Sequence, residues 1–255
     1  MPLKVFITGA SSGIGAALAR HYAESGAILG LAARRAAQLQ ALADALATPV
    51  SVYALDVADS AALAAAAQDF IARHGVPDIV IANAGISAAT WSERAADIAV
   101  LSNIMQVNVL GLAATLQPFV APMRERGSGA LVGIASVAGF RGFAGAGAYC
   151  ASKSAAITWL EGLRLELHGS GIDVLTICPG FVATPLTAAN RNPMPFLLEA
   201  PEAARRIARA IGATKRFAII PWQMRLVFFV LRRMPNALYD RLFARAPRKS
   251  RDSPR

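Results

Sequence analysis

Short apolar runs alternate with longer Ala- and Leu-rich stretches over the first two-thirds of the chain. The short runs carry almost no charge, which is typical of strands buried on both faces, and the longer stretches predict helices. Strands that alternate with helices favour a parallel sheet covered by helices on both sides. The predicted strands span residues 4–8, 28–33, 50–54, 78–82, 130–136 and 173–177, and the predicted helices span residues 13–24, 35–47, 60–74 and 149–168.

The pattern changes after Pro179. Residues 181–200 contain three prolines among short apolar patches, which predicts a flap or a short helical insert and not another regular strand and helix. Beyond this segment the sequence predicts a helix over 202–211, a last strand over 217–220, two short helices over 222–234 and 236–244 divided by Pro235, and a disordered end over 248–255.

Length and composition favour one large domain. The chain has 255 residues, of which 55% are hydrophobic and 16% charged, so disorder of the main body is excluded. The N-terminus runs directly into the first predicted strand without an apolar leader and cleavage site, and Cys150 and Cys178 lie far apart. We therefore expect a cytoplasmic, reduced protein.

The net charge of +10 is unevenly distributed. Residues 1–214 hold 15 Lys and Arg against 14 Asp and Glu, whereas residues 215–255 hold 11 Lys and Arg against two Asp. The basic character therefore belongs to the C-terminal segment and says nothing about the chemistry of the main body. This division predicts a main domain over residues 1–220 and a basic, partly helical extension over residues 221–255.

A glycine-rich turn follows the first predicted strand, in the run Thr8-Gly9-Ala10-Ser11-Ser12-Gly13-Ile14-Gly15. Glycines let a backbone turn sharply against a pyrophosphate, and the helix that follows directs its free N–H groups at that anion. A tight turn between a strand and a helix also needs glycine. The position near the N-terminus of an α/β chain, after a strand and before a helix, favours the dinucleotide site.

The end of the second predicted strand distinguishes the two nicotinamide dinucleotides. A carboxylate there would bind the ribose hydroxyls of NAD(H), but the chain has Ala33 at this position, followed by Arg34 and Arg35. A guanidinium suits a phosphate dianion, so Arg34, with Arg35 as a lesser contributor, favours NADP(H), with NAD(H) second. The alternative is that the two arginines only begin a solvated helix face.

Tyr149 and Lys153 are spaced i and i+4, which places them on one face of a predicted helix. An ammonium group stabilises a phenolate and lowers the pKa of the phenol, and a positive nicotinamide ring would add to that effect. The pair alone is more often a simple helix surface pair. Four further motifs accompany the Tyr149 and Lys153 pair. They are Ser136 at the end of a predicted strand, Asn83-Ala84-Gly85 at the end of another, Asn108, and Pro179-Gly180 after the last core strand.

With these motifs, in this order and spacing, the sequence resembles the short-chain dehydrogenase/reductase family over roughly residues 3–220. The resemblance implies a single-domain Rossmann fold with a doubly wound sheet of seven parallel strands and helices on both faces. It implies that Tyr149 is the general acid or base and that Lys153 binds the nicotinamide ribose. Ser136 would bind the substrate oxygen, and Asn108 would hold a water that relays protons.

The resemblance also implies the cofactor contacts. Gly9, Ser11, Ser12 and Ile14 would line the phosphates, Asp56 and Val57 would meet the adenine, and Thr184 with the backbone of Val182 would contact the carboxamide. Some NADP(H)-preferring members have a basic residue where this chain has Ser12. The full expected cofactor site consists of Gly9, Ser11, Ser12, Gly13, Ile14, Gly15, Arg34, Arg35, Asp56, Val57, Asn83, Ala84, Gly85, Tyr149, Lys153, Pro179, Gly180, Val182 and Thr184.

The residues expected around the substrate are mostly apolar, which predicts a hydrophobic ketone, aldehyde or secondary alcohol, such as a steroid- or lipid-like molecule. No His, Cys and carboxylate cluster predicts a metal site. The family resemblance implies a homodimer or homotetramer. The residues that by motif position face the substrate are Ile86, Ser87, Val137, Ala138, Gly139, Phe140, Phe143, Phe181 and the flap around Pro193–Leu198. Arg141 and Arg191 are the candidate cations there.

Residues 221–246 mix apolar and basic side chains, and their uncharged run is too short to span a bilayer. Their apolar side either packs on this chain or a second subunit, which we favour, or contacts the inner face of a membrane. Two other function classes remain open: a catalytically silent nucleotide-binding regulator and a binder of anionic surfaces. The complete catalytic set argues against the first. The tail aromatics lie within apolar runs, which argues against nucleic acid.

Overall fold

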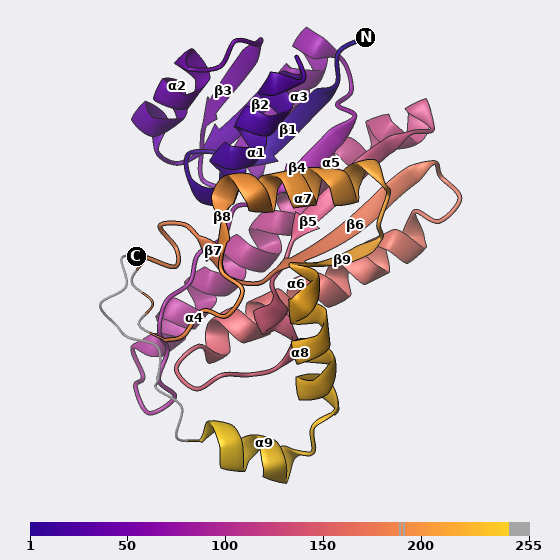
Figure 1. Ribbon diagram of the computed structural model, residues 1–255. Coiled ribbons are helices and arrows are strands. Elements are labelled where there is room, and N and C mark those ends of the chain that lie inside the picture. The colour runs from indigo at the N-terminus through magenta and orange to yellow at the C-terminus, as the bar shows by residue number, and fades with distance from the viewer. Residues whose placement is uncertain (189, 191, 245–255) are drawn as a thin grey trace.

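A central sheet organises the protein, which is described by a computed structural model over residues 1–188, 190 and 192–244 (Figure 1). The sheet has seven parallel strands in the order β3-β2-β1-β4-β5-β6-β9, which confirms the predicted doubly wound α/β fold. The strands are β1 Lys4–Thr8, β2 Ile28–Ala33, β3 Val50–Ala54, β4 Ile79–Ala82, β5 Gly129–Ile134, β6 Ile172–Pro179 and β9 Phe217–Ile220.

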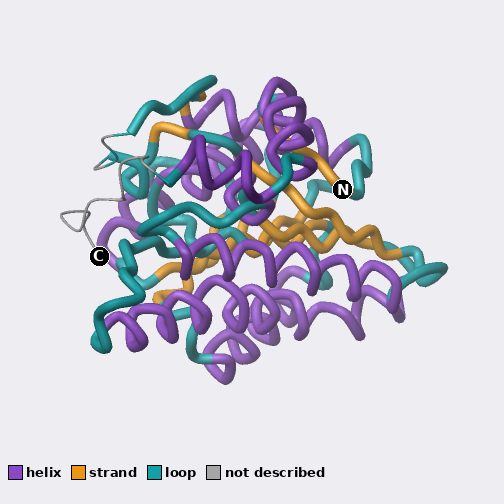
Figure 2. Tube along the Cα trace, turned by 90° about the horizontal axis from the view of Figure 1, so that it is seen from below, coloured by secondary structure: helices purple, strands orange, loops and turns teal. Residues whose placement is uncertain are grey.

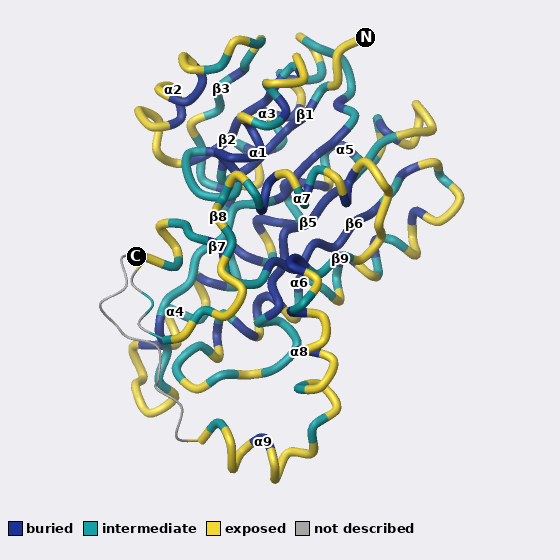
Figure 3. The backbone as a smooth tube through the Cα atoms, in the orientation of Figure 1, coloured by how far each residue is buried: buried dark blue, intermediate teal, exposed yellow. Residues whose placement is uncertain are grey.

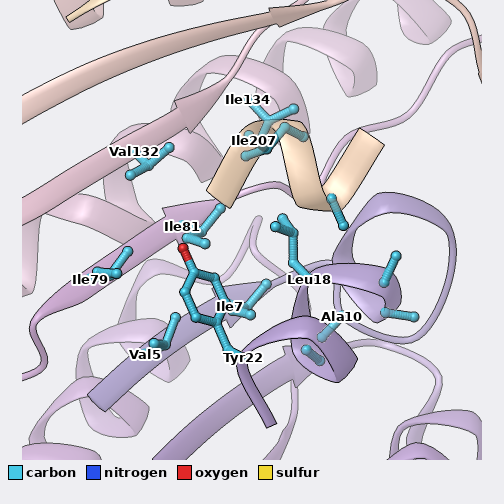
Figure 4. Close-up of a cluster of buried hydrophobic side chains, with 14 of the residues drawn as sticks. Val5, Ile7, Ala10, Leu18, Tyr22, Ile79, Ile81, Val132, Ile134 and Ile207 are labelled. Atoms are coloured by element: carbon cyan, nitrogen blue, oxygen red, sulfur yellow. The ribbon is translucent and has the colours of Figure 1, made fainter. Parts of the chain in front are cut away.

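Helices cover both faces of this sheet, and Figure 2 shows the strands as a layer between them. Alternation along β1 explains the two cores: Val5 and Ile7 pack on one side, with Leu18 and Ile207 (Figure 4), and Phe6 packs on the other. The first face carries α1 Gly13–Glu24, α2 Ala36–Asp44 and α7 Ala200–Gly212, and the second carries α3 Ser60–His74, α5 Gly111–Arg126 and α6 Gly147–Glu166.

The strand order reverses between β1 and β4, because the chain builds β2 and β3 on one side of β1 and the later strands on the other. Ligands of open α/β sheets bind in the crevice at such a switch point, beyond the carboxyl ends of the strands. The glycine-rich turn follows β1, Asn83 follows β4, Ser136 lies two residues beyond β5, and Pro179 ends β6. The topology therefore brings the predicted motifs to one edge.

The segment before β5 is helical, which the sequence analysis did not predict. It comprises α4 Asp97–Met105, a π-helical turn η1 over Gln106–Leu110, and α5. Within the continuous helical stretch Asp97–Arg126, an 18-residue window has a mean hydropathy of 1.5, so by length and composition the helix could cross a membrane. Leu112, Leu116 and Phe119 of α5 nevertheless pack against the sheet, which is the arrangement of a core helix.

The predicted flap contains two short paired strands, β7 Val182–Ala183 and β8 Leu198–Glu199. A 3-10 turn, η2 Val137–Phe140, lies between Ser136 and α6. The predicted terminal helices are confirmed as α8 Trp222–Arg233 and α9 Asn236–Phe243. The boundary at residue 220 stays a prediction, and Arg191 and the predicted disorder over 248–255 lie outside the described residues.

Helix α8 packs on the main body through one side only. Met224 and Phe228 join a small core with Ala135, Val137 and Cys178, with Phe140, Phe143 and Phe181 packed against it. The expectation that apolar residues of the extension pack on this chain is therefore confirmed for Met224 and Phe228. Figure 3 shows that most of α8 and α9 is exposed.

Candidate active site

Thr8, the last residue of β1, ties the glycine-rich turn to the end of β4. Its hydroxyl is buried and accepts hydrogen bonds from the backbone N–H groups of Asn83 (3.2 Å) and Ala84 (3.4 Å). The Asn83 amide returns two bonds, to the carbonyls of Thr8 (3.1 Å) and Gly9 (3.3 Å). Asn83 is thus a structural clamp on the turn. The sequence analysis gave Thr8 no role, although a hydroxyl just before the turn was the available signal.

The turn has no room for side chains. Gly9 has a φ of +68°, and a Cβ there would stand 2.7 Å from the Ala84 Cα. A Cβ at Gly15 would overlap the Gly9 carbonyl. Gly13 has a φ of +56° and lies against Thr184, with a would-be Cβ 3.1 Å from the Thr184 Cγ2. The turn and the Thr184 loop therefore meet, as the predicted cofactor site requires, and the close-packed backbone suits a dinucleotide pyrophosphate.

The two arginines after β2 point to different partners. The Arg35 guanidinium donates hydrogen bonds to the Ser11 hydroxyl (3.0 Å and 3.2 Å) and the Ser12 hydroxyl (2.6 Å) of the glycine-rich turn. Arg34 forms an exposed ion pair with Asp56, with a distance of 3.6 Å between Nη1 and Oδ2. Arg35 is exposed, as a residue on a solvated helix face would be, but its side chain reaches across to the glycine-rich turn.

The Asp56 and Val57 pair separates into two environments. Asp56 is partly exposed, and its carboxylate also accepts a hydrogen bond from the Ala58 N–H at 3.0 Å. Val57 is buried and packs against Gly111, where a Cβ would stand 2.8 Å from the Val57 Cγ2. Asp56 therefore lies partly exposed beside Arg34, whereas the Val57 side chain packs in the core.

Lys153 and Asn108 lie together below Gly85. A Cβ at Gly85 would stand 3.4 Å from the Lys153 Nζ and 3.3 Å from the Asn108 Oδ1. Lys153 is 4% exposed, and its Nζ donates to the Ile134 carbonyl at 2.9 Å. The glycine at position 85 thus leaves the space that lets the buried ammonium and amide approach the edge of the sheet.

Asn108 lies in the π-helical turn η1, a local widening of the helix that often occurs at functional sites. Its side chain is fully buried and donates to the Ile86 carbonyl and the Ser152 hydroxyl, both at 2.9 Å, and accepts from the Ile86 N–H at 2.8 Å. Ser152 in turn donates to the Tyr149 carbonyl at 2.8 Å. Ser152, which the sequence analysis did not single out, links Asn108 to the first turn of α6.

Ser136 and Tyr149 complete the cluster. Ser136 is buried, caps η2, and accepts a hydrogen bond from the Ala138 N–H at 3.1 Å. The Lys153 Nζ lies 5.9 Å from the centre of the Tyr149 ring. The structure therefore brings the four predicted catalytic residues to the carboxyl ends of β4 and β5, from three separate segments of the chain: η1, the end of β5 and helix α6.

Burial dominates the titration of this cluster. It raises the pKa of the Tyr149 phenol, while hydrogen bonding with the Ser136 hydroxyl acts in the opposite direction. Burial lowers the pKa of the Lys153 ammonium to about 8. Lys153 therefore titrates closer to neutral pH than an exposed lysine does. The expectation that Lys153 lowers the pKa of Tyr149 is wrong for the ligand-free site, because burial raises that pKa.

The loop after β6 is held by polar contacts and by α8. The Thr187 hydroxyl bonds to the Val182 carbonyl (2.6 Å) and accepts from the Thr184 N–H (3.1 Å), which orders the predicted carboxamide-binding segment. Gly180 donates to the Ile220 carbonyl at 2.7 Å, and a Cβ at Gly180 would stand 2.9 Å from the Met224 Cγ.

Among the residues that the structure describes, no group of three His, Cys, Asp or Glu side chains could hold a metal ion.

Comparisons with known proteins agree with this geometry. The short chain dehydrogenase family model matches residues 4–195. An uncharacterized oxidoreductase from Myxococcus xanthus is 41% identical over 92% of this chain and 93% of its own. An 11-beta-hydroxysteroid dehydrogenase-like protein, 4A, from Arabidopsis thaliana is 33% identical over 93% of this chain and 82% of its own.

Solved structures share the fold. A short chain dehydrogenase/reductase from Burkholderia phymatum in complex with NAD has a TM-score of 0.81 and 25% identity, covering 98% of this chain and 97% of its own. An alcohol dehydrogenase from Thermococcus sibiricus complexed with 5-hydroxy-NADP has a TM-score of 0.76 and 26% identity, covering 86% of this chain and 95% of its own. The chain thus belongs to the short-chain dehydrogenase/reductase family and is an oxidoreductase.

Proposed function

We propose that this enzyme interconverts a carbonyl and a secondary alcohol with NADP(H), using Tyr149 as the general acid or base. The observation that carries the proposal is the convergence of Ser136, Tyr149, Lys153 and Asn108 at the switch-point edge, beside a glycine turn that fits a pyrophosphate. NADP(H), when bound, supplies or accepts the hydride.

In this proposal the Ser136 hydroxyl binds the substrate oxygen, and Tyr149 gives that oxygen a proton during reduction or removes one during oxidation. Because burial raises the pKa of Tyr149, its phenol stays protonated in the ligand-free site and is ready to act as an acid. Lys153 binds the nicotinamide ribose and, with a pKa of about 8, exchanges protons near neutral pH. Asn108 holds the water through which those protons reach solvent.

The preference for NADP(H) rests on charge at the end of β2. Arg35 already donates to Ser11 and Ser12 on the turn, and Arg34 lies beside it. A 2′-phosphate would accept hydrogen bonds from the guanidinium and the two hydroxyls, and Ala33 provides no carboxylate to repel it. Thr184 and the Val182 backbone are proposed to bind the carboxamide end.

The substrate is proposed to be hydrophobic. Phe140, Phe143 and Phe181 pack against the small core next to Ser136, and this aromatic wall suits an apolar molecule. The name of the Arabidopsis relative points to steroids, which have the same character. We further propose a cytoplasmic protein that works as a homodimer or homotetramer.

One assay tests the chemistry. Wild type and Tyr149→Phe are compared on a panel of lipophilic ketones, aldehydes and short charged carbonyls, each with NADPH and NADH. We expect the wild type to reduce lipophilic carbonyls with NADPH, and the variant to lose on the order of 100-fold or more in kcat because the acid is removed.

Tryptophan-fluorescence titration with NADPH is the control, since the variant should still bind the cofactor. Full activity of Tyr149→Phe would refute the mechanism, and turnover restricted to short charged carbonyls would refute the substrate class.

A further inference from the structure

Helix α8 is apolar on two opposite sides. Its inner side, with Met224, Phe228 and Leu231, packs on the main body. On the outer side Leu226 is 60% exposed and Phe229 is 56% exposed. A helix that packs on the protein core through one side normally presents polar residues to solvent on its other side. The outer face of α8 therefore lacks the polar character expected of a helix that faces only water.

Helix α9, which follows α8 in the chain, also exposes apolar side chains. Leu238 and Leu242 are spaced i and i+4 and are both exposed, while Tyr239 between them is buried. We call the exposed apolar residues of α8 and α9 together the outer apolar face. Its residues are Trp222, Leu226, Phe229, Val230, Leu238 and Leu242.

Arginines surround the outer apolar face. Arg225 and Arg232 lie on the flank of α8, and the Arg233 guanidinium lies 3.7 Å from the centre of the Phe229 ring. With Arg241 on α9 there are four exposed arginines over the two helices, against Asp240 as the acidic residue. Apolar side chains with Trp and Phe among them, combined with arginines, are the composition of helices that lie in a membrane interface.

Helix α9 also contacts the loop over residues 137–146, which lies between Ser136 and Tyr149. The Tyr239 hydroxyl donates to the Gly142 carbonyl at 2.7 Å, and Arg141 donates to the Asn236 side chain at 3.0 Å. The Arg141 guanidinium lies 4.2 Å from the centre of the Tyr239 ring. The segment clamped in this way joins Ser136 to Tyr149, so α9 is anchored directly on the loop beside the reacting groups.

We propose that the outer apolar face binds the interface of an anionic lipid bilayer, with α8 and α9 lying in its plane. Charge selects this occupant. A second copy that met this face through a two-fold axis would bring four arginines against four arginines, whereas anionic lipid headgroups neutralise them. Bilayer contact would place the loop over residues 137–146 at the lipid surface, where a hydrophobic substrate concentrates. The binding itself does not depend on the proposed reaction.

Flotation with the full chain tests the proposal. The vesicles are phosphatidylcholine alone or phosphatidylcholine with about 30% phosphatidylglycerol, to provide a negative surface. We expect the wild type to float with the anionic vesicles and to be released as salt rises from about 0.1 M to about 0.5 M. Leu226→Gln/Phe229→Gln should lower the partition coefficient about tenfold through lost apolar burial.

Arg225→Gln/Arg232→Gln should lower binding to anionic vesicles by about tenfold while leaving the apolar residues in place. The matched control is Ile98→Gln/Leu165→Gln, which removes apolar side chains that are 68% and 62% exposed elsewhere on the molecule. This control should float like the wild type. Circular dichroism confirms that each variant is folded, and the arginine pair serves alone if the apolar pair does not fold.

Absence of wild-type flotation would overturn the proposal, as would equal flotation of wild type and both α8 variants. If the wild type stays unbound and light scattering shows that Leu226→Gln/Phe229→Gln loses a subunit, then a second copy covers the face. Because the readout is binding, loss of activity in Tyr149→Phe, or its persistence, leaves this result unaffected.

Discussion

Arg35 lies beside the glycine-rich turn, where the 2′-phosphate of NADP(H) is proposed to bind. Its guanidinium spans two hydroxyls of the glycine-rich turn, whereas the neighbouring Arg34 is engaged by the Asp56 carboxylate. The sequence analysis placed the cofactor argument mainly on Arg34, because position along the chain was the available guide. Side-chain direction changes that weighting, since a guanidinium already aimed at the turn loses less freedom when it binds a phosphate.

Arg35→Ala should therefore raise the KM for NADPH about ten- to hundredfold, because a charge-assisted hydrogen bond to phosphate is removed. The KM for NADH should change little, and Arg34→Ala should have a smaller effect on NADPH. Initial-rate kinetics with both cofactors measure this. Arg73→Ala, which breaks an exposed ion pair with Asp69 on α3, is the control. Equal losses with NADPH and NADH in Arg35→Ala would contradict the assignment.

At the scale of elements, α9 contacts the loop that joins Ser136 to Tyr149. Tyr239 is buried, stacks on Phe243 with ring centres 4.6 Å apart, and donates to the Gly142 carbonyl. The loop between Ser136 and Tyr149 has a single 3-10 turn, η2, as regular structure before α6 begins. Its shape therefore depends on contacts from outside, and α9 supplies a hydrogen bond and an aromatic surface.

Tyr239→Phe keeps the ring and removes the donor. The unfolding free energy should fall by about 1 kcal/mol, as for one neutral hydrogen bond, and the KM for a lipophilic carbonyl should rise several-fold while that for NADPH stays constant. Urea unfolding and steady-state kinetics measure the two effects. Tyr53→Phe, which loses a bond to Asp69 at 2.8 Å beside the distant strand β3, is the matched control. The idea fails if the two variants have the same substrate KM.

At the scale of the whole molecule, the fold buries the ammonium of Lys153 at the edge formed by the carboxyl ends of the seven-stranded sheet. Burial disfavours the charged form of Lys153, and its pKa falls from 10.5 to about 8. The packing of the whole sheet and its helices provides the free energy that this burial costs. Below pH 8 both the folded and unfolded states hold this proton. Between about 8 and 10.5 the unfolded chain holds it while the folded state has released it, so stability rises with pH in that window.

Between pH 7 and 9 the wild type should therefore gain about 1 kcal/mol of unfolding free energy relative to Lys153→Met. Urea denaturation at pH 7, 8 and 9 measures the difference, and the subtraction cancels the other groups that titrate in this range. Lys215→Met, at an exposed position, should follow the wild type at every pH. Parallel curves for wild type and Lys153→Met would show that burial does not shift the lysine.

The sequence analysis missed two kinds of element, each for its own reason. The helix α5 contains Pro118 and Pro122 and begins at Gly111, residues that local propensity assigns to loops. Packing on the sheet through Leu116 and Phe119 overrides that preference. The paired strands β7 and β8 are two residues each, too short to leave a periodic pattern.

The sequence by itself determined the sheet, the glycine turn and which residues are proposed as the catalytic cluster. Buried strands, tight turns and an i, i+4 pair leave local patterns because their physical requirements are local. The tertiary structure decided what the side chains touch: Arg35 rather than Arg34 on the turn, Thr8 and Ser152 as links, and α8 packed on one side with its other side open. Such contacts join residues far apart in the chain, so only the folded arrangement specifies them.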